Sequence, residues 1–213
     1  MMSKVVVDIF EWKSKRGGEG SGNFGHEGRP GEIGGSGSGG SGVSKIMEIN
    51  SGLKDIPVIE TPAFGQEILG RYDENKNIVY LGKEESQKPL KMYQDEEDGT
   101  PPFNRFTGKD ATLTHEYAHA LDYDVGKQTS SFGLYGRAMS ETSDEWKNMF
   151  DYQLNNYKLN GRDGSVISRY SMTNVREFFA ESVTSYMLDP EWLQSRNPAV
   201  YNLVDLTLNS LKE

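Results

Sequence analysis

Apolar residues recur at helical spacing through the C-terminal half of the chain, and this pattern predicts a mainly helical region. One stripe has members three or four positions apart: Trp146, Met149, Phe150, Leu154 and Tyr157. Such a stripe is typical of a helix face that packs into a core. Thr142 and Glu145 stand at capping-box spacing just before it, so this helix is predicted to begin there.

Three further helices are predicted from their start and stop signals. The first begins near Thr107, whose hydroxyl can cap it, and ends before Gly126. The second begins near Thr173 or Asn174 and ends before Pro190. The last follows the pair Asn197-Pro198, which supplies a cap and an N1 proline, and it runs to the C-terminus.

The first half of the folded region favours strands. β-forming residues in 67–72 and 78–81 flank an Asp- and Asn-rich stretch at 73–77, which predicts two strands joined by a turn. Residues 44–53 predict a short helix or strand. Together these patterns predict an α+β fold, in which a small twisted sheet packs on the helix that begins near Thr107 and a mainly helical half follows.

A glycine-rich segment precedes the folded region. Thirteen of the 26 residues from Gly17 to Gly42 are glycine. Such a composition buries too little apolar surface to offset the entropy cost of ordering the chain. We therefore expect an N-terminal arm or short strand in residues 1–12, a flexible linker in residues 13–43 and one folded domain in residues 44–213.

Composition narrows the classes of partner and of metal site. The formal net charge of −9 argues against nucleic acid or an anionic membrane as the main partner. The chain has no cysteine, so a metal must be held by His, Asp or Glu. No segment approaches the roughly 18 consecutive apolar residues of a membrane span, and the start does not have the pattern of a Sec-type signal peptide.

An H-E-x-x-H pattern, formed by His115, Glu116 and His119, lies inside the helix predicted from Thr107. Because the two histidines are four residues apart, they lie on one helix face about one turn apart. Two imidazoles presented in this way can hold one Zn²⁺, with Glu116 as general base. Two of only three histidines in the chain stand here, which favours a metal site over a chance pattern on a polar helix.

A second helix offers the third ligand that a catalytic zinc site requires. Glu177 and Glu181 are four residues apart and share one helix face. Two carboxylates on an otherwise apolar helix are costly unless a cation compensates them. We therefore expect Glu177 to bind the zinc, and Glu181 to accept the N–H of a ligand histidine. Asp122, one turn after His119, is a further candidate for such a contact. The alternative is that both glutamates face solvent.

Two blocks of sequence, His115–Asp122 and Tyr170–Glu181, resemble the catalytic domain of anthrax toxin lethal factor and the related Pro-Pro endopeptidases. The resemblance extends from roughly Tyr72 to the C-terminus and implies a zincin-like zinc endopeptidase that acts on a protein or peptide. It implies the ligand and base roles given above. It also adds Tyr170 as the group that stabilises the oxyanion. From its residue type alone, Tyr170 could equally be a packed aromatic with a surface hydroxyl.

Residues 22–31 resemble a segment of tailed-phage head and neck proteins. This resemblance implies a phage- or prophage-associated enzyme, located in the virion or the host cytoplasm, whose N-terminal arm contacts a particle protein. The substrate is expected to lie extended along an edge strand. The residues expected there are Asn77, Ile78, Val79, Tyr80 and Leu81. The alternative function is a non-enzymatic phage structural or adaptor protein that retains the zincin fold.

Overall fold

The computed structural model describes residues 42–61, 69–82, 105–106, 108–129, 137–160 and 166–212. The predicted N-terminal arm, nearly all of the predicted linker and the phage-like segment at residues 22–31 lie outside these residues. The position predicted to cap the first long helix, Thr107, also lies outside them.

The described helices follow one another through most of the chain. They are α2 (Gly42–Ile49), α3 (Lys109–Thr129), α4 (Met139–Thr142), α5 (Asp144–Asn160), α6 (Val175–Leu188), α7 (Pro190–Arg196) and α8 (Pro198–Ser210). Two short 3-10 helices, η1 (Ser51–Asp55) and η4 (Tyr170–Met172), accompany them. No helix in the described part of the chain is long and apolar enough to cross a membrane. The helices from α3 to α8 confirm the predicted mainly helical C-terminal half.

A three-stranded sheet consists of β1 (Val58–Thr61), β2 (Gly70–Asp73) and β3 (Ile78–Gly82) in the order β1-β3-β2. β3 pairs with β2 in antiparallel fashion and with β1 in parallel fashion. The predicted pair of strands joined by a turn is confirmed. β1 was not predicted, because three of its four residues, Val58, Ile59 and Glu60, are exposed and show no alternating pattern. Its pairing makes β3 the central strand.

The turn between β2 and β3 is closed by its Asp and Asn residues, as their turn chemistry predicts. A carboxylate oxygen of Asp73 accepts hydrogen bonds from the backbone N–H groups of Asn75 and Lys76, each at 3.1 Å. Asn77 adopts a positive φ of 56°, a conformation that Asn tolerates better than most residues. Its side-chain oxygen accepts a hydrogen bond from the hydroxyl of Tyr72 at 2.8 Å, which ties the turn to β2.

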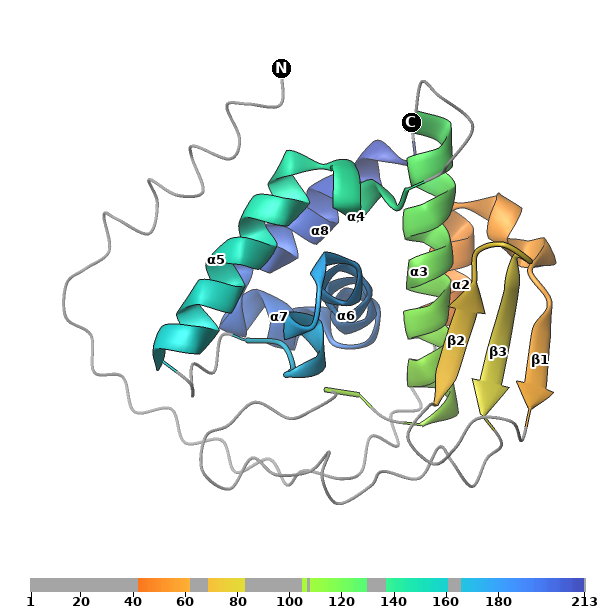
Figure 1. The fold of residues 1–213 in the computed structure, drawn as a ribbon, viewed down its shortest axis with the longest axis horizontal. Coiled ribbons are helices and arrows are strands. Elements are labelled where there is room, and N and C mark those ends of the chain that lie inside the picture. Colours follow the sequence, from red (N-terminus) through yellow and green to blue (C-terminus); the bar gives the residue numbers. More distant parts are fainter. Residues whose placement is uncertain are drawn as a thin grey trace. The chain divides into compact units, whose positions relative to one another are not determined.

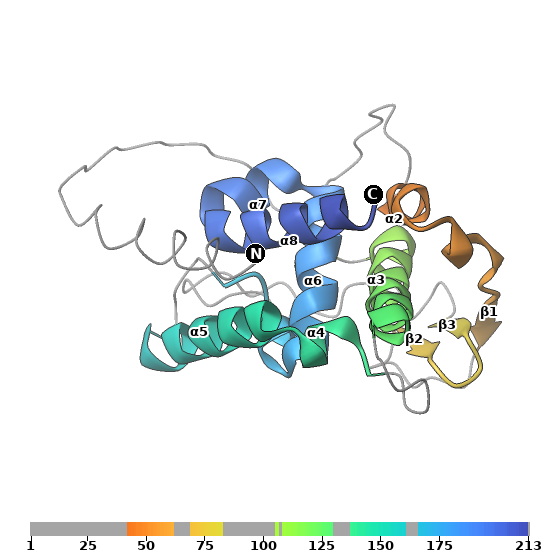
Figure 2. The same ribbon diagram turned by 90° about the horizontal axis from the view of Figure 1, so that it is seen from above.

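Helix α3 is the central element, with the sheet on one side and α6 on the other (Figures 1 and 2). It continues to Thr129 and does not end before Gly126 as predicted. Gly126 is buried inside the helix, where a Cβ atom would collide with the backbone carbonyl of Arg137 and would lie 2.7 Å from the backbone nitrogen of Met139. This glycine therefore permits close approach of the segment that leads into α4, and is not a C-terminal cap.

Local capping explains where the later helices begin. Thr142 belongs to α4, so the predicted capping box is wrong; Ser143 instead accepts a hydrogen bond from the backbone N–H of Trp146 at 3.3 Å. Asn174 caps α6, which begins where predicted, and Asn197 caps α8 ahead of its N1 proline, as predicted. The short helix α7 between them was not predicted.

The helical core is built around aromatic side chains from α5 and α6. Trp146 is 1% exposed, and the rings of Phe178 and Phe179 lie 5.9 and 4.6 Å from its ring. Burial of each large apolar side chain is worth about 1.5–3 kcal/mol. On the other side of α3, the fully buried Ile46 anchors α2, and Lys45 donates a hydrogen bond to the backbone carbonyl of Met187 at 2.7 Å. These contacts fix α3 and α6 relative to each other.

Candidate metal centre

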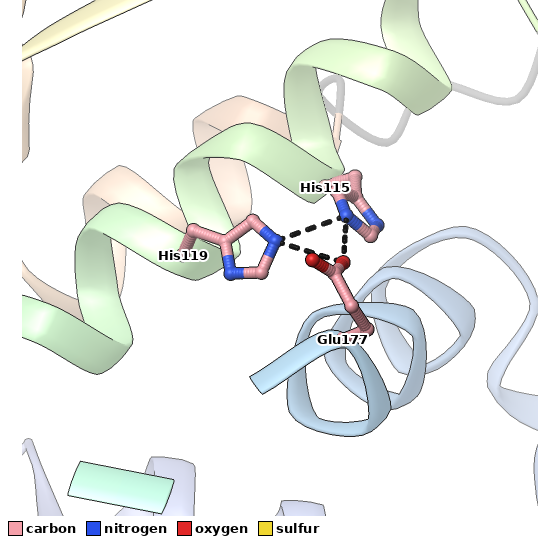
Figure 3. Close-up of side chains that lie close together, drawn as sticks. All are labelled: His115, His119 and Glu177. Carbon is pink, nitrogen blue, oxygen red and sulfur yellow. Dashed lines mark hydrogen bonds and ion pairs between the residues drawn. The ribbon is translucent and has the colours of Figure 1, made fainter. Parts of the chain in front are cut away.

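Two histidines and one glutamate from two separate helices converge on one point. His115 and His119 lie on α3, and Glu177 lies in the first turn of α6 (Figure 3). The Nε2 atoms of the histidines are 3.1 Å apart, and each lies 3.1 Å from Oε2 of Glu177. The three atoms thus form a nearly equilateral triangle, and the structure brings together the three residues that the sequence offered as ligands.

Local structure holds each of these side chains in place. The four-residue spacing on α3 puts both imidazoles on the face toward α6. On α6, the side chain of Asn174 accepts hydrogen bonds from the backbone N–H groups of Arg176 and Glu177, both at 3.0 Å. This cap fixes the first turn of α6, so the position of Glu177 is set by the helix start and not by a flexible loop.

The donor set fits a divalent cation. Two ligand atoms about 2.0–2.1 Å from a tetrahedral zinc ion are about 3.3 Å apart, close to the 3.1 Å observed. Nδ1 of His115 faces Glu181, and an ionised carboxylate only accepts hydrogen bonds, so Nδ1 carries the hydrogen of the neutral ring. Its Nε2 lone pair then points at a carboxylate oxygen. Either a proton on Nε2 or a metal ion held by both atoms relieves this repulsion.

The pKa shifts show the same preference for positive charge. Burial by itself would lower the pKa of His115, but hydrogen bonds to Glu177 and Glu181 raise it well above its usual value. Burial would raise the pKa of Glu177, yet its hydrogen bonds to both histidines hold that pKa far below the usual range. A buried site that stabilises protonated imidazole and ionised carboxylate is electrostatically suited to a metal ion.

Glu181 lies behind His115, as the sequence predicts for a carboxylate that orients a ligand. It is 5% exposed, and its Oε1 accepts the hydrogen bond from Nδ1 of His115 at 2.9 Å. Its Oε2 accepts a hydrogen bond from the hydroxyl of Ser168 at 2.7 Å. Both oxygens are therefore engaged, and the imidazole ring cannot rotate without breaking a buried charge-assisted hydrogen bond.

Glu116 points to the sheet side of the same site. It is 6% exposed, and its Oε2 accepts a hydrogen bond from the backbone N–H of Tyr72 in β2 at 2.6 Å. Burial raises the pKa of Glu116, while the nearby histidines and the Tyr72 amide oppose this shift. A Cβ atom at Gly70 would lie 3.0 Å from Oε1 of Glu116. Strand β2 thus holds one carboxylate oxygen and stands close to the other.

Tyr170 lies at the start of η4, beside the metal-ligand candidates. Its ring is 5.8 Å from the ring of His115. Burial, the charges of Glu177, Glu116 and Glu181, and a hydrogen bond to Glu177 together raise the pKa of its hydroxyl well above the usual value. Tyr170 therefore keeps its proton at neutral pH and remains a hydrogen-bond donor in the site.

Two expectations about the surroundings of the site are wrong. Asp122 does not contact a histidine ring nitrogen: its two oxygens accept hydrogen bonds from the backbone N–H and the hydroxyl of Ser140, at 2.8 and 2.6 Å. It therefore ties α3 to α4. Nδ1 of His119, the ring nitrogen that Asp122 could have bonded, has no hydrogen-bond partner among the described residues.

The expected substrate strand is also wrong. Ile78, Val79, Tyr80 and Leu81 belong to β3, which is paired on both sides by β1 and β2 and offers no free edge. Asn77 belongs to the turn before it, where its side chain contacts the hydroxyl of Tyr72. Val79 and Leu81 are fully buried. These residues build the core of the sheet and cannot pair with a bound peptide.

Gly70, the backbone of Tyr72, and Ser168 contact site residues but were not predicted. Gly70 and Tyr72 contact Glu116 across 44 or more positions of sequence, and Ser168 contacts Glu181 from the turn before η4. A glycine inside a strand pattern is the only one of these signals visible beforehand, since it often marks close approach of another group.

Comparison with known proteins identifies the family. The family model for the glucose-regulated metallo-peptidase M90 matches residues 68–207, which is more than half of the chain and includes both α3 and α6. No significant match was found among curated proteins or solved structures. Helix α2, η1 and β1 precede the matched region. The chain belongs to the M90 family of metallopeptidases, which bind a metal and act on proteins or peptides.

Proposed function

We propose that this chain is a zinc-dependent endopeptidase. The observation that carries the proposal is the convergence of Nε2 of His115, Nε2 of His119 and Oε2 of Glu177 at mutual distances of 3.1 Å. Two imidazoles and one carboxylate are a donor set of catalytic zinc sites, in which the fourth position stays open. When bound, zinc would supply Lewis acidity that activates a water molecule and polarises the scissile carbonyl.

Glu116 is proposed as the general base. It follows His115 directly in α3, and the Tyr72 amide holds one of its oxygens. The other oxygen is free to take a proton from the attacking water and to pass it to the leaving amine. Burial raises its pKa toward that of the group with which it exchanges a proton, which favours both halves of this transfer.

Tyr170 is proposed as the oxyanion donor. Its ring lies beside that of His115, and its raised pKa keeps the hydroxyl protonated. A donor of this kind contributes about 10²- to 10³-fold to the rate when it is aimed at the developing oxyanion. The hydrogen bond to Glu177 would be exchanged for one to the substrate oxygen.

The substrate is proposed to lie along the outer edge of β2, and not along β3. The carbonyl of Leu69 accepts a hydrogen bond from Gly82 and therefore faces β3. Backbone groups alternate along a strand, so those of Gly70 and Tyr72 face the other way, and the Tyr72 amide meets Glu116 there. An extended peptide would pair with the outward backbone groups of this edge that Glu116 does not engage, next to that glutamate. The association with a phage particle is supported by the resemblance of residues 22–31.

The test compares wild type with Glu116→Gln, with Glu191→Gln as a matched control on the exposed surface of α7. All three proteins are expected to bind one zinc ion per chain, measured by elemental analysis. Wild type and the control should cleave labelled casein or members of a broad peptide library, and Glu116→Gln should not. Zinc-loaded wild type that cleaves nothing across the library, or Glu116→Gln that cleaves like wild type, would refute the proposal.

A comparison of protein N-termini across a proteome would then identify the substrates. New N-termini should appear with wild type and be missing with Glu116→Gln. Intact-mass measurement of the purified wild type after long incubation would show whether the chain also cuts its own glycine-rich segment. The sequence around the recovered cleavage sites would give the specificity.

A further inference from the structure

Ser168 lies in the short turn directly before η4, and it is completely buried. Its hydroxyl donates a hydrogen bond to Oε2 of Glu181 at 2.7 Å. The hydroxyl oxygen of Ser168 in turn accepts a hydrogen bond from the backbone N–H of Ser171 at 3.0 Å. One hydroxyl group therefore links the backbone of this turn to a carboxylate on α6.

Glu181 passes this connection on to the metal site. Its other oxygen, Oε1, accepts the hydrogen bond from Nδ1 of His115 at 2.9 Å. Glu181 is 5% exposed, so an oxygen that lost its donor would have little access to water as a replacement. An unsatisfied buried carboxylate oxygen is costly. Without the Ser168 hydroxyl, Glu181 is therefore expected to shift toward another donor and to move the His115 ring with it.

The same turn carries Tyr170. Ser168 and Ser171 are joined by a second hydrogen bond, from the hydroxyl of Ser171 to the backbone carbonyl of Ser168 at 2.7 Å. Tyr170 stands between these two residues in the chain, and its ring lies 5.8 Å from that of His115. The turn is thus closed by its own serines and fastened to Glu181 by one of them.

We propose that Ser168 is a positioning residue of the metal centre. Its hydroxyl holds Glu181 and, through Glu181, the ring of His115, and the turn that it closes keeps Tyr170 beside that ring. This role rests on the proposed function, because it treats His115 as a zinc ligand. It assigns one buried hydroxyl to the alignment of both the ligand and the oxyanion donor.

The test uses Ser168→Ala together with Ser140→Ala as a matched control. Ser140 is also fully buried, and its hydroxyl donates to a carboxylate, Asp122, at 2.6 Å. Both variants lose the same kind of buried bond, and only Ser168 is connected to the metal site. Ser168→Cys is the second variant, because it leaves no cavity, with a somewhat larger sulfur in place of the oxygen, but offers only a weak S–H donor.

The zinc dissociation constant is measured by competition with a chromophoric chelator, a readout that does not depend on cleavage. Loss of an outer hydrogen-bond partner of a metal ligand typically costs about 10- to 100-fold in affinity. Ser168 is one bond further out, so Ser168→Ala and Ser168→Cys should weaken zinc binding by roughly 3- to 10-fold. Ser140→Ala should bind zinc like wild type. The NMR signal of the His115 Nδ1–H proton should move in the Ser168 variants and stay in place in Ser140→Ala.

The outcomes separate this inference from the proposed function. Wild type that binds no zinc would overturn the function. Wild type that binds zinc, with Ser168→Cys of equal affinity and an unmoved His115 proton signal, would overturn the role of Ser168 alone. Equal losses of zinc affinity in Ser168→Ala and Ser140→Ala would also overturn it, because a general loss of stability would then explain the effect.

Discussion

Gly70→Ala is expected to disable Glu116 while it leaves the metal ligands in place. A Cβ atom at position 70 would lie 2.7 Å from Cγ2 of Thr112 and 3.0 Å from both Cγ and Oε1 of Glu116. Ordinary contacts of this kind begin at 3.4 Å, so the methyl group needs 3.4 − 2.7 = 0.7 Å more room beside Thr112. Thr112 and Glu116 are both buried on α3, so β2 must move away from the helix.

The displacement of β2 acts directly on the hydrogen bond that holds Glu116. A shift of about 0.7 Å would lengthen the bond from the Tyr72 amide, now 2.6 Å, toward the limit of a useful hydrogen bond. A hydrogen bond to a charged group is worth about 1.5–3 kcal/mol. Because about 1.4 kcal/mol corresponds to a tenfold change in rate, we expect kcat/KM to fall by about 10- to 100-fold. Overpacking should also cost about 1–3 kcal/mol of stability.

The assay measures zinc affinity by chelator competition and kcat/KM on a peptide that wild type cleaves. Gly52→Ala is the control, because a Cβ atom there would meet only the Asn50 side chain, at 3.1 Å. Since the Tyr72 amide lowers the pKa of Glu116, its loss should also move the acidic limb of the activity profile of Gly70→Ala to higher pH. Wild-type kcat/KM in Gly70→Ala, or a loss of zinc binding equal to the loss of activity, would refute the reasoning.

Three further predictions concern stability. Burial raises the pKa of Asp122 in the folded protein to about 6, above its value of about 3.9 in the unfolded chain. The protonated carboxyl group therefore stabilises the fold fully below about pH 3.9, and this contribution of about 3 kcal/mol is lost as the pH rises through about 6. In urea unfolding with chelator present, wild type should be less stable at pH 7 than at pH 4 by this amount, and Asp122→Asn should not show this difference. Gly126→Ala should lower the melting temperature more than Gly52→Ala, because its methyl group collides with the backbone of Arg137. Zinc at about 1,000 times its dissociation constant should raise the unfolding free energy of wild type by about 4 kcal/mol in urea unfolding. His119→Ala should lose this effect.

Short-range interactions explain what could be predicted from the sequence. The four-residue spacing of His115 and His119 fixes their common face once a helix forms, whatever surrounds it. The caps Asn174 and Asn197 act on backbone groups two or three positions away, so they mark helix starts locally. The need of a buried carboxylate for a compensating charge then pointed to Glu177 as the partner of the histidines.

Contacts between distant segments explain what could not be predicted. Gly126 has the local signature of a helix end, and only the backbone of Arg137 beside it reveals a glycine of close approach. Asp122 has the spacing of a partner for His119, but Ser140 takes both of its oxygens. Arg137 and Ser140 are both too far away in the sequence for the local pattern around Gly126 or Asp122 to reveal these contacts.

The sequence by itself determined the chemistry of this protein: which helix presents two imidazoles, which one offers carboxylates, and where α6 and α8 start. Only the tertiary structure decided that β2 contacts Glu116 and that the turn of Ser168 contacts Glu181. An exposed β1 made β3 the central strand and left β2 next to Glu116. The physical reason is that helix faces and caps are set within one or two turns of the chain, whereas strand order and the hydrogen-bond partner of a buried side chain depend on which distant segments pack together.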